Sequence, residues 1–340
     1  MKKTVCFGEL MLSLCPRGYY RFIQVDQAEM FYTGAESNVA ASLAQYGLKT
    51  EYVTRLPEHA IGEAAEASLR KYNIGTSFIA KGGDRIGVIY TERGASQRPS
   101  SVIYDRAGSA FAASPVDCYD WDAIFADADW FHFTGITPAL SDNLAEITLE
   151  ACKKAKQYGI TVSCDLNYRK KLWTTEKAGR VMRQLLPYVD VLIANEEDAE
   201  KVLGMKAGNS DVNSGILEHA GYIDVARQIH EEFGIPFIAT TLRKSISASD
   251  NDWSAMLWHD GQAYFSKTYS IHIVNRVGGG DSFSGGLIYG MKQNLPIQET
   301  LEFATAASCL KHSIEMDYNL VSVEQVRALM NGDGSGRVQR

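Results

Sequence analysis

The chain has 340 residues, of which 45% are hydrophobic and 22% are charged, and its formal net charge at pH 7 is −7. These values are typical of a globular protein with one large domain or two, and they exclude a long disordered or fibrous chain. Because lysine and arginine are not in excess, we expect no nucleic-acid partner.

The sequence shows no signal for export or for a membrane. Gly8 and Glu9 interrupt the apolar stretch near the N-terminus, so the hydrophobic segment of a signal peptide is missing. No window approaches the roughly 18 to 20 apolar residues of a membrane span. We therefore expect a cytoplasmic protein, and its six cysteines, which lack metal-binding spacing, are expected to be reduced core residues.

Short apolar runs alternate with segments of helical periodicity, which is the pattern of βαβ units and a mostly parallel sheet. The expected strands are residues 4–7, 50–54, 130–134, 161–165, 189–194 and 237–241. The expected helices are residues 37–46, 61–72, 142–158, 175–186, 197–203 and 223–233, with a late one from 283 to about 292.

Two regions break this alternation, because they contain strand patterns without a helix between them. Their expected strands are residues 11–14, 22–24, 29–32, 87–92 and 101–104. We interpret residues 11–32 and 85–105 as a small antiparallel lid that covers a site, although a sheet used only for oligomer formation fits the pattern too. The body then comprises residues 1–10, 33–84 and 106–330, and residues 331–340 form a flexible tail.

A run of glycines precedes the late helix, in the segment Val277-Gly278-Gly279-Gly280-Asp281. Glycines let backbone N–H groups approach an anion, and the first turn of a helix adds unpaired N–H groups and a partial positive charge. Gly278, Gly279 and Gly280 would then hold a phosphate, and Asp281 would accept a proton from an attacking hydroxyl. An ordinary tight turn before a helix is the alternative.

Two motifs about 240 residues apart resemble the signatures of the ribokinase-like, or pfkB, family of carbohydrate kinases. The first is Gly34-Ala35-Glu36-Ser37-Asn38-Val39-Ala40, and the second is Gly278-Gly279-Gly280-Asp281-Ser282-Phe283 followed by Gly286. The resemblance implies a three-layer α/β/α fold with a mostly parallel sheet, and a reaction that uses ATP and Mg²⁺. It also implies that Gly34, Ala35, Asn38 and Asp281 contact the sugar.

A third segment resembles the family's N-x-x-E motif, with Asn195 at its first position and Asp198 in place of the glutamate. The resemblance implies that the acidic group acts on magnesium and phosphates through water, and the shorter Asp198 needs one further water to do so. An N-cap by Asn195 with an acidic first helical turn is the structural alternative.

Within the family, the stretch from Cys164 to Trp173 resembles the D-x-N-x-R-x-x-L-W segment of 2-keto-3-deoxygluconate kinases. That resemblance implies that Arg106 and Arg169 bind the carboxylate and keto end of a sugar acid, for which a planar guanidinium is well suited. Tyr90 and Tyr104 would contact the sugar chain. For each of these residues, a surface ion pair or simple packing is the alternative.

The nucleotide-binding segments depart from the family pattern. The resemblance places Asn195, Thr241, Arg243, Gly278, Gly280 and Thr305 around ATP, but the usual T-x-G-x-x-G loop reads Thr241-Leu242-Arg243-Lys244-Ser245-Ile246 here. Arg243 and Lys244 can compensate for the missing glycines by binding phosphate. Asn275 replaces an aspartate that organises a monovalent-cation loop in many members, so activation by potassium is doubtful.

Three expectations complete the interpretation. Asp281, at a helix N-terminus, is expected to stay ionised at neutral pH. The exposed edges and apolar residues of the lid predict a homodimer formed through it. The expected activity is phosphorylation of the terminal hydroxyl of 2-keto-3-deoxygluconate. The alternatives are a kinase for a neutral sugar such as fructose or ribose, and a non-catalytic sensor. A dehydrogenase is a poor fit, because no G-x-G-x-x-G follows the first strand.

Overall fold

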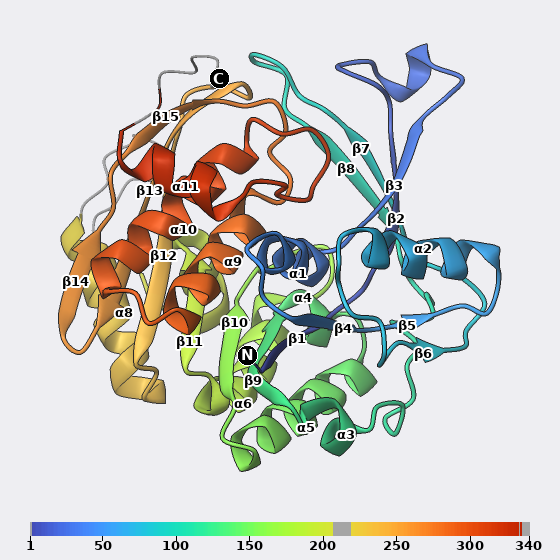
Figure 1. Ribbon diagram of the computed structural model, residues 1–340, viewed down its shortest axis with the longest axis horizontal. Coiled ribbons are helices and arrows are strands. Elements are labelled where there is room, and N and C mark those ends of the chain that lie inside the picture. Colours follow the sequence, from blue (N-terminus) through green and yellow to red (C-terminus); the bar gives the residue numbers. More distant parts are fainter. Residues whose placement is uncertain (1, 207–218, 333, 335–340) are drawn as a thin grey trace.

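The computed structural model describes residues 2–206, 219–332 and 334. Its main sheet has the strand order β14-β13-β12-β11-β10-β9-β1-β4, and β15 pairs with β13 (Figure 1). Strands β4, β1, β9, β10, β11 and β12 are parallel to one another, and β13, β14 and β15 extend the sheet in antiparallel fashion. Their bounds are β1 Lys3–Phe7, β4 Thr50–Val53, β9 Ala128–Thr134, β10 Thr161–Asp165, β11 Val191–Asn195, β12 Phe237–Ser245, β13 Asp250–His259, β14 Gln262–Phe265 and β15 Tyr269–His272.

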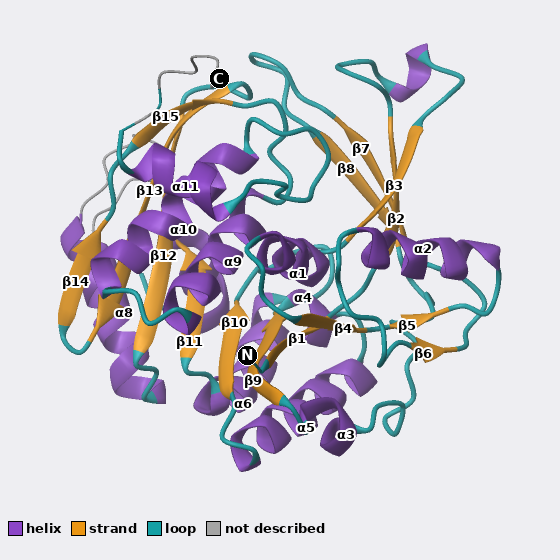
Figure 2. Cartoon of the chain, in the orientation of Figure 1, coloured by secondary structure: helices purple, strands orange, loops and turns teal. Residues whose placement is uncertain are grey.

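Helices cover both faces of this sheet, so the expected three layers are confirmed (Figure 2). One face packs against α3 (Trp121–Phe125), α5 (Asp142–Gln157), α6 (Thr175–Leu185) and α8 (His219–Phe233). The other face packs against α1 (Ala35–Gln45), α2 (Ala60–Lys71), α9 (Gly279–Lys292), α10 (Ile297–Lys311) and α11 (Val323–Met330). Short elements are α4 (Ile136–Ala139), α7 (Glu196–Asp198), the 3-10 helix Leu186–Tyr188, the π-helix Ala199–Leu203, and the strands β5 (Arg55–Leu56) and β6 (Ala80–Lys81).

The sheet is buried on both faces because successive side chains of each strand point to opposite sides. In β1, Val5 and Phe7 belong to one hydrophobic cluster, and Cys6 between them belongs to the other. In β9, Phe131 and Trp130 divide in the same way. A continuous apolar run in the sequence therefore supplies two separate cores, and it correctly predicted central strands.

All the expected body strands and helices are present, with ends shifted by a few residues. The late helix starts earlier than expected, at Gly279, so two of the three glycines lie within it. Strands β13 to β15 were not predicted from the sequence. The first of them begins with Asp250, Asn251 and Asp252, which have low β propensity, and its pairing partner β12 decides its conformation instead.

A second sheet projects from the body, as Figure 1 shows at the upper right, in the strand order β3-β2-β7-β8. Its strands are β2 Met11–Cys15, β3 Glu29–Thr33, β7 Val88–Glu92 and β8 Ser101–Asp105. Two of its pairings are antiparallel, and the central pairing of β2 with β7 is parallel. We call this sheet, with the segments that join its strands, the lid.

The predicted strand at residues 22–24 is wrong, because Phe22–Gln24 forms a single 3-10 turn between β2 and β3. The Phe22 N–H group donates to Glu92 Oε1 at 2.7 Å, and Gln24 caps the turn by accepting from the Arg21 N–H group. Ile23 is 89% exposed at its tip. Three residues are too few to distinguish a strand from a turn by periodicity.

Within the described ranges, no helix combines the length and the apolar character needed to cross a bilayer. The six cysteines are free thiols, and four of them are buried. Residue 333 and residues 335–340 of the predicted tail lie outside the described residues.

The parallel strands all end at the same edge of the sheet, and polar residues stand where they end. Thr134 ends β9, Asp165 ends β10 and Asn195 ends β11, and Glu9 follows β1 by two residues. In open α/β sheets, ligands bind at this carboxyl edge. The fold therefore brings together polar residues that are far apart in the sequence.

Candidate active site

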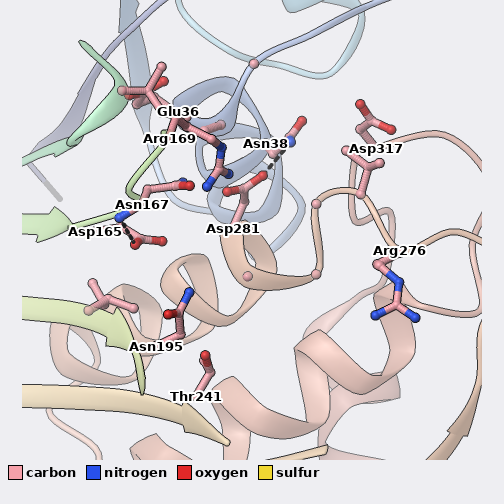
Figure 3. A pocket seen from close by; sticks show the side chains of 18 of the residues that line it. Glu36, Asn38, Asp165, Asn167, Arg169, Asn195, Thr241, Arg276, Asp281 and Asp317 are labelled. Atoms are coloured by element: carbon pink, nitrogen blue, oxygen red, sulfur yellow. Dashed lines mark hydrogen bonds between the residues drawn. The ribbon is translucent and has the colours of Figure 1, made fainter. Parts of the chain in front are cut away.

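A cavity of about 780 Å³ lies at the carboxyl edge of the sheet, between the first turns of α1 and α9 and the lid (Figure 3). It collects most of the residues singled out from the sequence. These are Gly34, Ala35, Asn38, Tyr104, Arg106, Arg169, Asn195, Asp198, Thr241, Arg243, Gly278, Gly279, Gly280 and Asp281. Gly34 directly precedes α1 and Gly278 directly precedes α9, so the two signature motifs place two helix N-termini at one cavity.

Gly278, the residue before α9, has the left-handed conformation, with φ of +83°. A Cβ atom at this position would lie 2.1 Å from the carbonyl oxygen of Asp317, so no other residue fits without moving the backbone. At Gly280, by contrast, a Cβ would meet no atom within 4 Å. The close approach at Gly278 fixes where the unpaired N–H groups of the first turn of α9 point.

Asp281 lies in this first turn, and its Oδ2 accepts a hydrogen bond of 2.6 Å from Asn38 Nδ2 on α1 (Figure 3). This bond joins the two signature motifs. Burial in the cavity wall raises the pKa of Asp281 to about 7, against the lowering effect of the Asn38 bond. The helix N-terminus was expected to keep Asp281 ionised at neutral pH, but desolvation raises its pKa instead of letting the helix lower it.

Two further carboxylates line the cavity beside Asp281. Asp165 accepts a hydrogen bond from the Asn167 N–H group at 3.0 Å, and Asp198 accepts one from the Tyr168 N–H group at 3.0 Å. Burial raises the pKa of Asp198 to about 6, and burial together with the nearby Asp198 and Asp281 raises the pKa of Asp165 well above its usual value. Asn195 Oδ1 accepts from the Asp198 N–H group at 2.9 Å, so the helix cap is present as well.

These oxygen atoms are the ligand type that Mg²⁺ prefers. Among the described residues, no three His, Cys, Asp or Glu side chains converge as a set of direct metal ligands. The residues present fit a magnesium ion that would keep its own water, and Asp198 and Asn195 would hold it through that water.

The two expected carboxylate-binding arginines are held differently. Arg106 is buried, and its Nε and Nη2 atoms lie 2.6 and 2.5 Å from Glu9 Oε2. Its guanidinium also lies over the Tyr104 ring, 5.5 Å from the centroid. Arg169 bonds through Nη1 to the carbonyl oxygen of Tyr168 at 3.1 Å and extends toward Asp281 (Figure 3). Arg169 thus offers its remaining donors to the cavity, and Arg106 is fixed in place by Glu9.

A second basic group lines the cavity beyond the glycine loop, and it consists of Arg243 and Lys244 at the end of β12 and Arg276 before Gly278. Burial and the neighbouring charge of Arg243 lower the pKa of Arg276. Arg276 Nη2 donates to the carbonyl oxygens of Ser247 and Ala248 at 3.4 and 3.3 Å. Two neighbouring guanidinium groups that repel each other are stabilised when an anion such as a polyphosphate binds both of them.

Tyr90 and Thr305 do not line the cavity. Tyr90 alternates with Ile89, which does line it, so the Tyr90 side chain points to the opposite face of the lid and packs edge-on against Phe22. Thr305 is fully buried in α10, where its hydroxyl donates to the Leu301 carbonyl oxygen at 2.9 Å.

Sequence reasoning assigned no role to several residues that line the cavity, notably Glu9, Asp165, Arg276 and Asp317. A charged residue directly after or at the end of an apolar strand is a usable signal, and it would have found Glu9 and Asp165. Asp317 follows a helix by six residues and enters the site only through tertiary packing.

Comparison with known proteins agrees with this site. The pattern of the family described as "pfkB family carbohydrate kinase" matches residues 1–314. The chain therefore belongs to the pfkB family of carbohydrate kinases.

Individual relatives are similar over nearly their whole length. The crystal structure of a 2-dehydro-3-deoxygluconokinase from Thermotoga maritima is 49% identical, with a TM-score of 0.93 over 97% of this chain and 98% of that one. A pfkB family carbohydrate kinase from Listeria grayi is 33% identical, with a TM-score of 0.90 over 97% and 100% of the two chains. A 2-dehydro-3-deoxygalactonokinase from Haloferax volcanii is 30% identical and aligns over 98% of both chains.

The geometry of the glycine loop predicts different effects of alanine at two neighbouring positions. Gly278→Ala should lower the midpoint of thermal unfolding by several degrees, because a Cβ would collide with Asp317 and force a positive φ on alanine. Gly280→Ala should leave the midpoint unchanged or slightly raised, since the position is open and helical. Calorimetry of both variants checks this, and equal losses would contradict the proposed close approach.

Proposed function

We propose that the protein transfers the γ-phosphoryl group of ATP to the terminal primary hydroxyl of 2-keto-3-deoxygluconate, which is also called 2-dehydro-3-deoxygluconate. The observation that carries this proposal is that Asp281, the N–H groups of the glycine loop and the Arg169 guanidinium face one cavity. A proton acceptor, an anion site and a carboxylate-binding cation are the three groups that this reaction needs.

In the proposed reaction, the substrate hydroxyl oxygen forms a bond to the γ-phosphorus, and the bond from that phosphorus to ADP breaks. Asp281 accepts the hydroxyl proton, and Asn38 holds its carboxylate in position. N–H groups at Gly278, Gly279 and Gly280 stabilise the charge on the moving phosphoryl oxygens, an effect worth about 3 to 4 kcal/mol for one donor in comparable anion sites. Positioning dominates, because the transition state of phosphoryl transfer is loose.

The cations divide the cavity between the two substrates. We assign Arg243, Lys244 and Arg276 to the phosphates of ATP, with Thr241 and Asn195 beside the nucleotide. When bound, Mg²⁺ neutralises phosphate charge, and Asp198 faces it through water. Arg169 and Arg106 take the sugar acid, with Gly34, Ala35, Asn38 and Tyr104 along its length. The ion pair with Glu9 already holds the Arg106 guanidinium in position, so this side chain loses less conformational entropy when the substrate binds.

A substrate panel tests this assignment. We expect ADP release with 2-keto-3-deoxygluconate or 2-keto-3-deoxygalactonate in the presence of Mg-ATP, and at least 100-fold lower kcat/KM with fructose, ribose or adenosine, because neutral sugars leave Arg169 without an anion. Arg169→Leu should raise KM for the acids about 10- to 100-fold and change KM for ATP little, as expected for loss of a charge-assisted bond.

If the protein prefers a neutral sugar in this panel, the proposal that it is a kinase stands, and the proposal that Arg169 binds a carboxylate is rejected. Binding of a sugar acid without any ADP release would favour a sensor. The names of the relatives do not choose between the gluconate and galactonate forms, since a 2-dehydro-3-deoxygluconokinase and a 2-dehydro-3-deoxygalactonokinase both align over the whole chain.

The raised pKa of Asp281 predicts an acid limb in the activity. Only the ionised carboxylate accepts a proton, so kcat/KM should fall below pH 7, approaching tenfold per pH unit. Asp281→Asn should lower kcat by about 10²- to 10⁴-fold while the sugar acid still binds, since the amide oxygen can still accept from Asn38. The fall of kcat/KM below pH 7 should be absent in this variant. If the fall persists, the group that titrates is a substrate phosphate and not Asp281.

We further propose that residues 11–32 and 85–105 act as a lid and that two lids pair in a homodimer. By register, Leu14 lies opposite Met30 on one side and Tyr90 on the other, and Ile103 lies opposite Tyr90. These four side chains therefore share the face of the lid that points away from the cavity. Met30 and Ile103 are each 56% exposed there, which is unusual for large apolar residues in a sheet.

Light scattering of the purified protein at micromolar concentration should therefore give the mass of a dimer. The double variant Met30→Asp, Ile103→Asp should give a monomer, because a charge at each position disfavours apolar pairing. Ile246→Asp is the matched control, since Ile246 is 62% exposed but lies outside the lid. A monomeric wild-type protein, or a dimeric double variant, would argue against pairing through this face.

A further inference from the structure

Lys311, the last residue of α10, is fully buried. Its Nζ atom donates to the carbonyl oxygen of Ile314 at 3.2 Å. Among the residues that the structure describes, no carboxylate oxygen lies within 4 Å of this amine, so an ordinary ion pair does not account for its burial. An ammonium removed from water in this way destabilises a fold unless something compensates for it.

The position of Lys311 indicates what compensates. A Cβ atom built on Gly278 would lie 3.2 Å from Lys311 Cε, so the end of the lysine chain lies directly behind the glycine loop. The carbonyl groups at the end of α10 carry a partial negative charge that favours a cation there. The ammonium thus lies on the protein side of the loop whose N–H groups face the cavity.

Asp317 continues this arrangement. Its Oδ2 accepts from Thr33 Oγ1 at 2.7 Å, its Oδ1 accepts from Asn275 Nδ2 at 3.4 Å, and its backbone oxygen contacts the loop at Gly278. Lys311 therefore belongs to a buried polar group that holds the loop from behind. The groups that donate to Asp317 are neutral, so they leave its negative charge in place. The Asp317 carboxylate and the Lys311 ammonium therefore attract each other over a distance longer than that of an ion pair.

We propose that Lys311 is a positioning residue whose fixed positive charge, placed behind the glycine loop, stabilises the phosphoryl group during transfer. This inference rests on the proposed kinase function. The cations that line the cavity lie elsewhere: Arg243 lies near the end of β12, and Arg276 and Arg169 lie on opposite sides of Asp281 (Figure 3). A charge in a buried, preorganised place acts more strongly than one in water and needs no rearrangement during the reaction.

The charged and titratable groups around Lys311 indicate that a bound anion would stabilise its charged form. Burial lowers the pKa of Lys311 to about 8, Asp317 and Asp281 oppose that lowering, and Arg93 adds to it. His312, the next residue, has a pKa lowered to about 4 by burial, so it contributes no charge at neutral pH. A phosphate above the loop raises the pKa of Lys311 again and keeps it charged.

Lys311→Met tests the charge, because methionine keeps most of the chain length and is apolar. We expect kcat to fall on the order of 100-fold with KM for the sugar acid unchanged, and the unfolding temperature to stay the same or rise. Lys292→Met is the matched control. Lys292 is a buried lysine at the far end of α9 that pairs with Asp129, so its loss should lower the unfolding temperature and leave kcat near the wild-type value.

Two further measurements separate charge from packing. Lys311→Ala should regain part of its kcat with ammonium or methylammonium chloride and not with choline chloride at equal ionic strength. Deprotonation of Lys311 should lower kcat/KM of the wild type above about pH 8, and this alkaline fall should be absent in Lys311→Met. If Lys311→Met does not fold, Lys311→Gln replaces it, since the amide keeps the bond to Ile314 without the charge.

Nucleotide binding without sugar keeps this inference separate from the proposed substrate. Lys311→Met should lose affinity for the ATP analogue AMP-PNP at least tenfold more than for ADP, measured by calorimetry with Mg²⁺. If no sugar acid is turned over but this difference appears, the substrate proposal fails and the role of Lys311 stands. A wild-type kcat together with a wild-type ratio of the two affinities in Lys311→Met overturns the inference.

Discussion

The close approach between Gly278 and the segment after α10 is the constraint on which the site depends. Because residue 278 has no side chain, the carbonyl oxygen of Asp317 can lie where a Cβ would be. This contact sets the direction in which α9 begins, and hence the direction of its unpaired N–H groups and of Asp281. The anion site is therefore made by backbone packing, and the side chains around it are arranged with respect to that packing.

The second determinant is the burial of charge. Burial in one cavity wall raises the pKa values of Asp165, Asp198 and Asp281, and the charges of Asp198 and Asp281 raise that of Asp165 further. Arginines on two sides of the cavity, and Lys311 behind the loop, oppose this excess of negative charge. A cavity with both signs of charge in separate places is suited to hold a carboxylate, a polyphosphate and a magnesium ion at the same time.

The lid has two faces with different roles. Ile89 and Tyr104 lie opposite each other in the register and line the cavity, whereas Tyr90 and Ile103 lie on the other face. A shift of one residue along a strand thus separates a residue that lines the cavity from one on the surface that we propose pairs with a second chain. Tyr90 was expected to contact the sugar. The structure places it on the outer face, and the strand alternation is the reason.

The sequence by itself determined the order of the parallel strands and of the long helices between them, because apolar runs and helical periods are local properties of the chain. It also located Asp281, Asn38 and the glycine loop, since their motifs are contiguous. Tertiary structure alone decided that Asn38 bonds to Asp281 across 243 positions, that Glu9 holds Arg106, and that β13 to β15 extend the sheet. It also decided that desolvation leaves the pKa of Asp281 near 7, and that Lys311 and Asp317 lie behind Gly278. These features depend on distances between residues remote in the chain and on exclusion of water, and neither is encoded in local patterns.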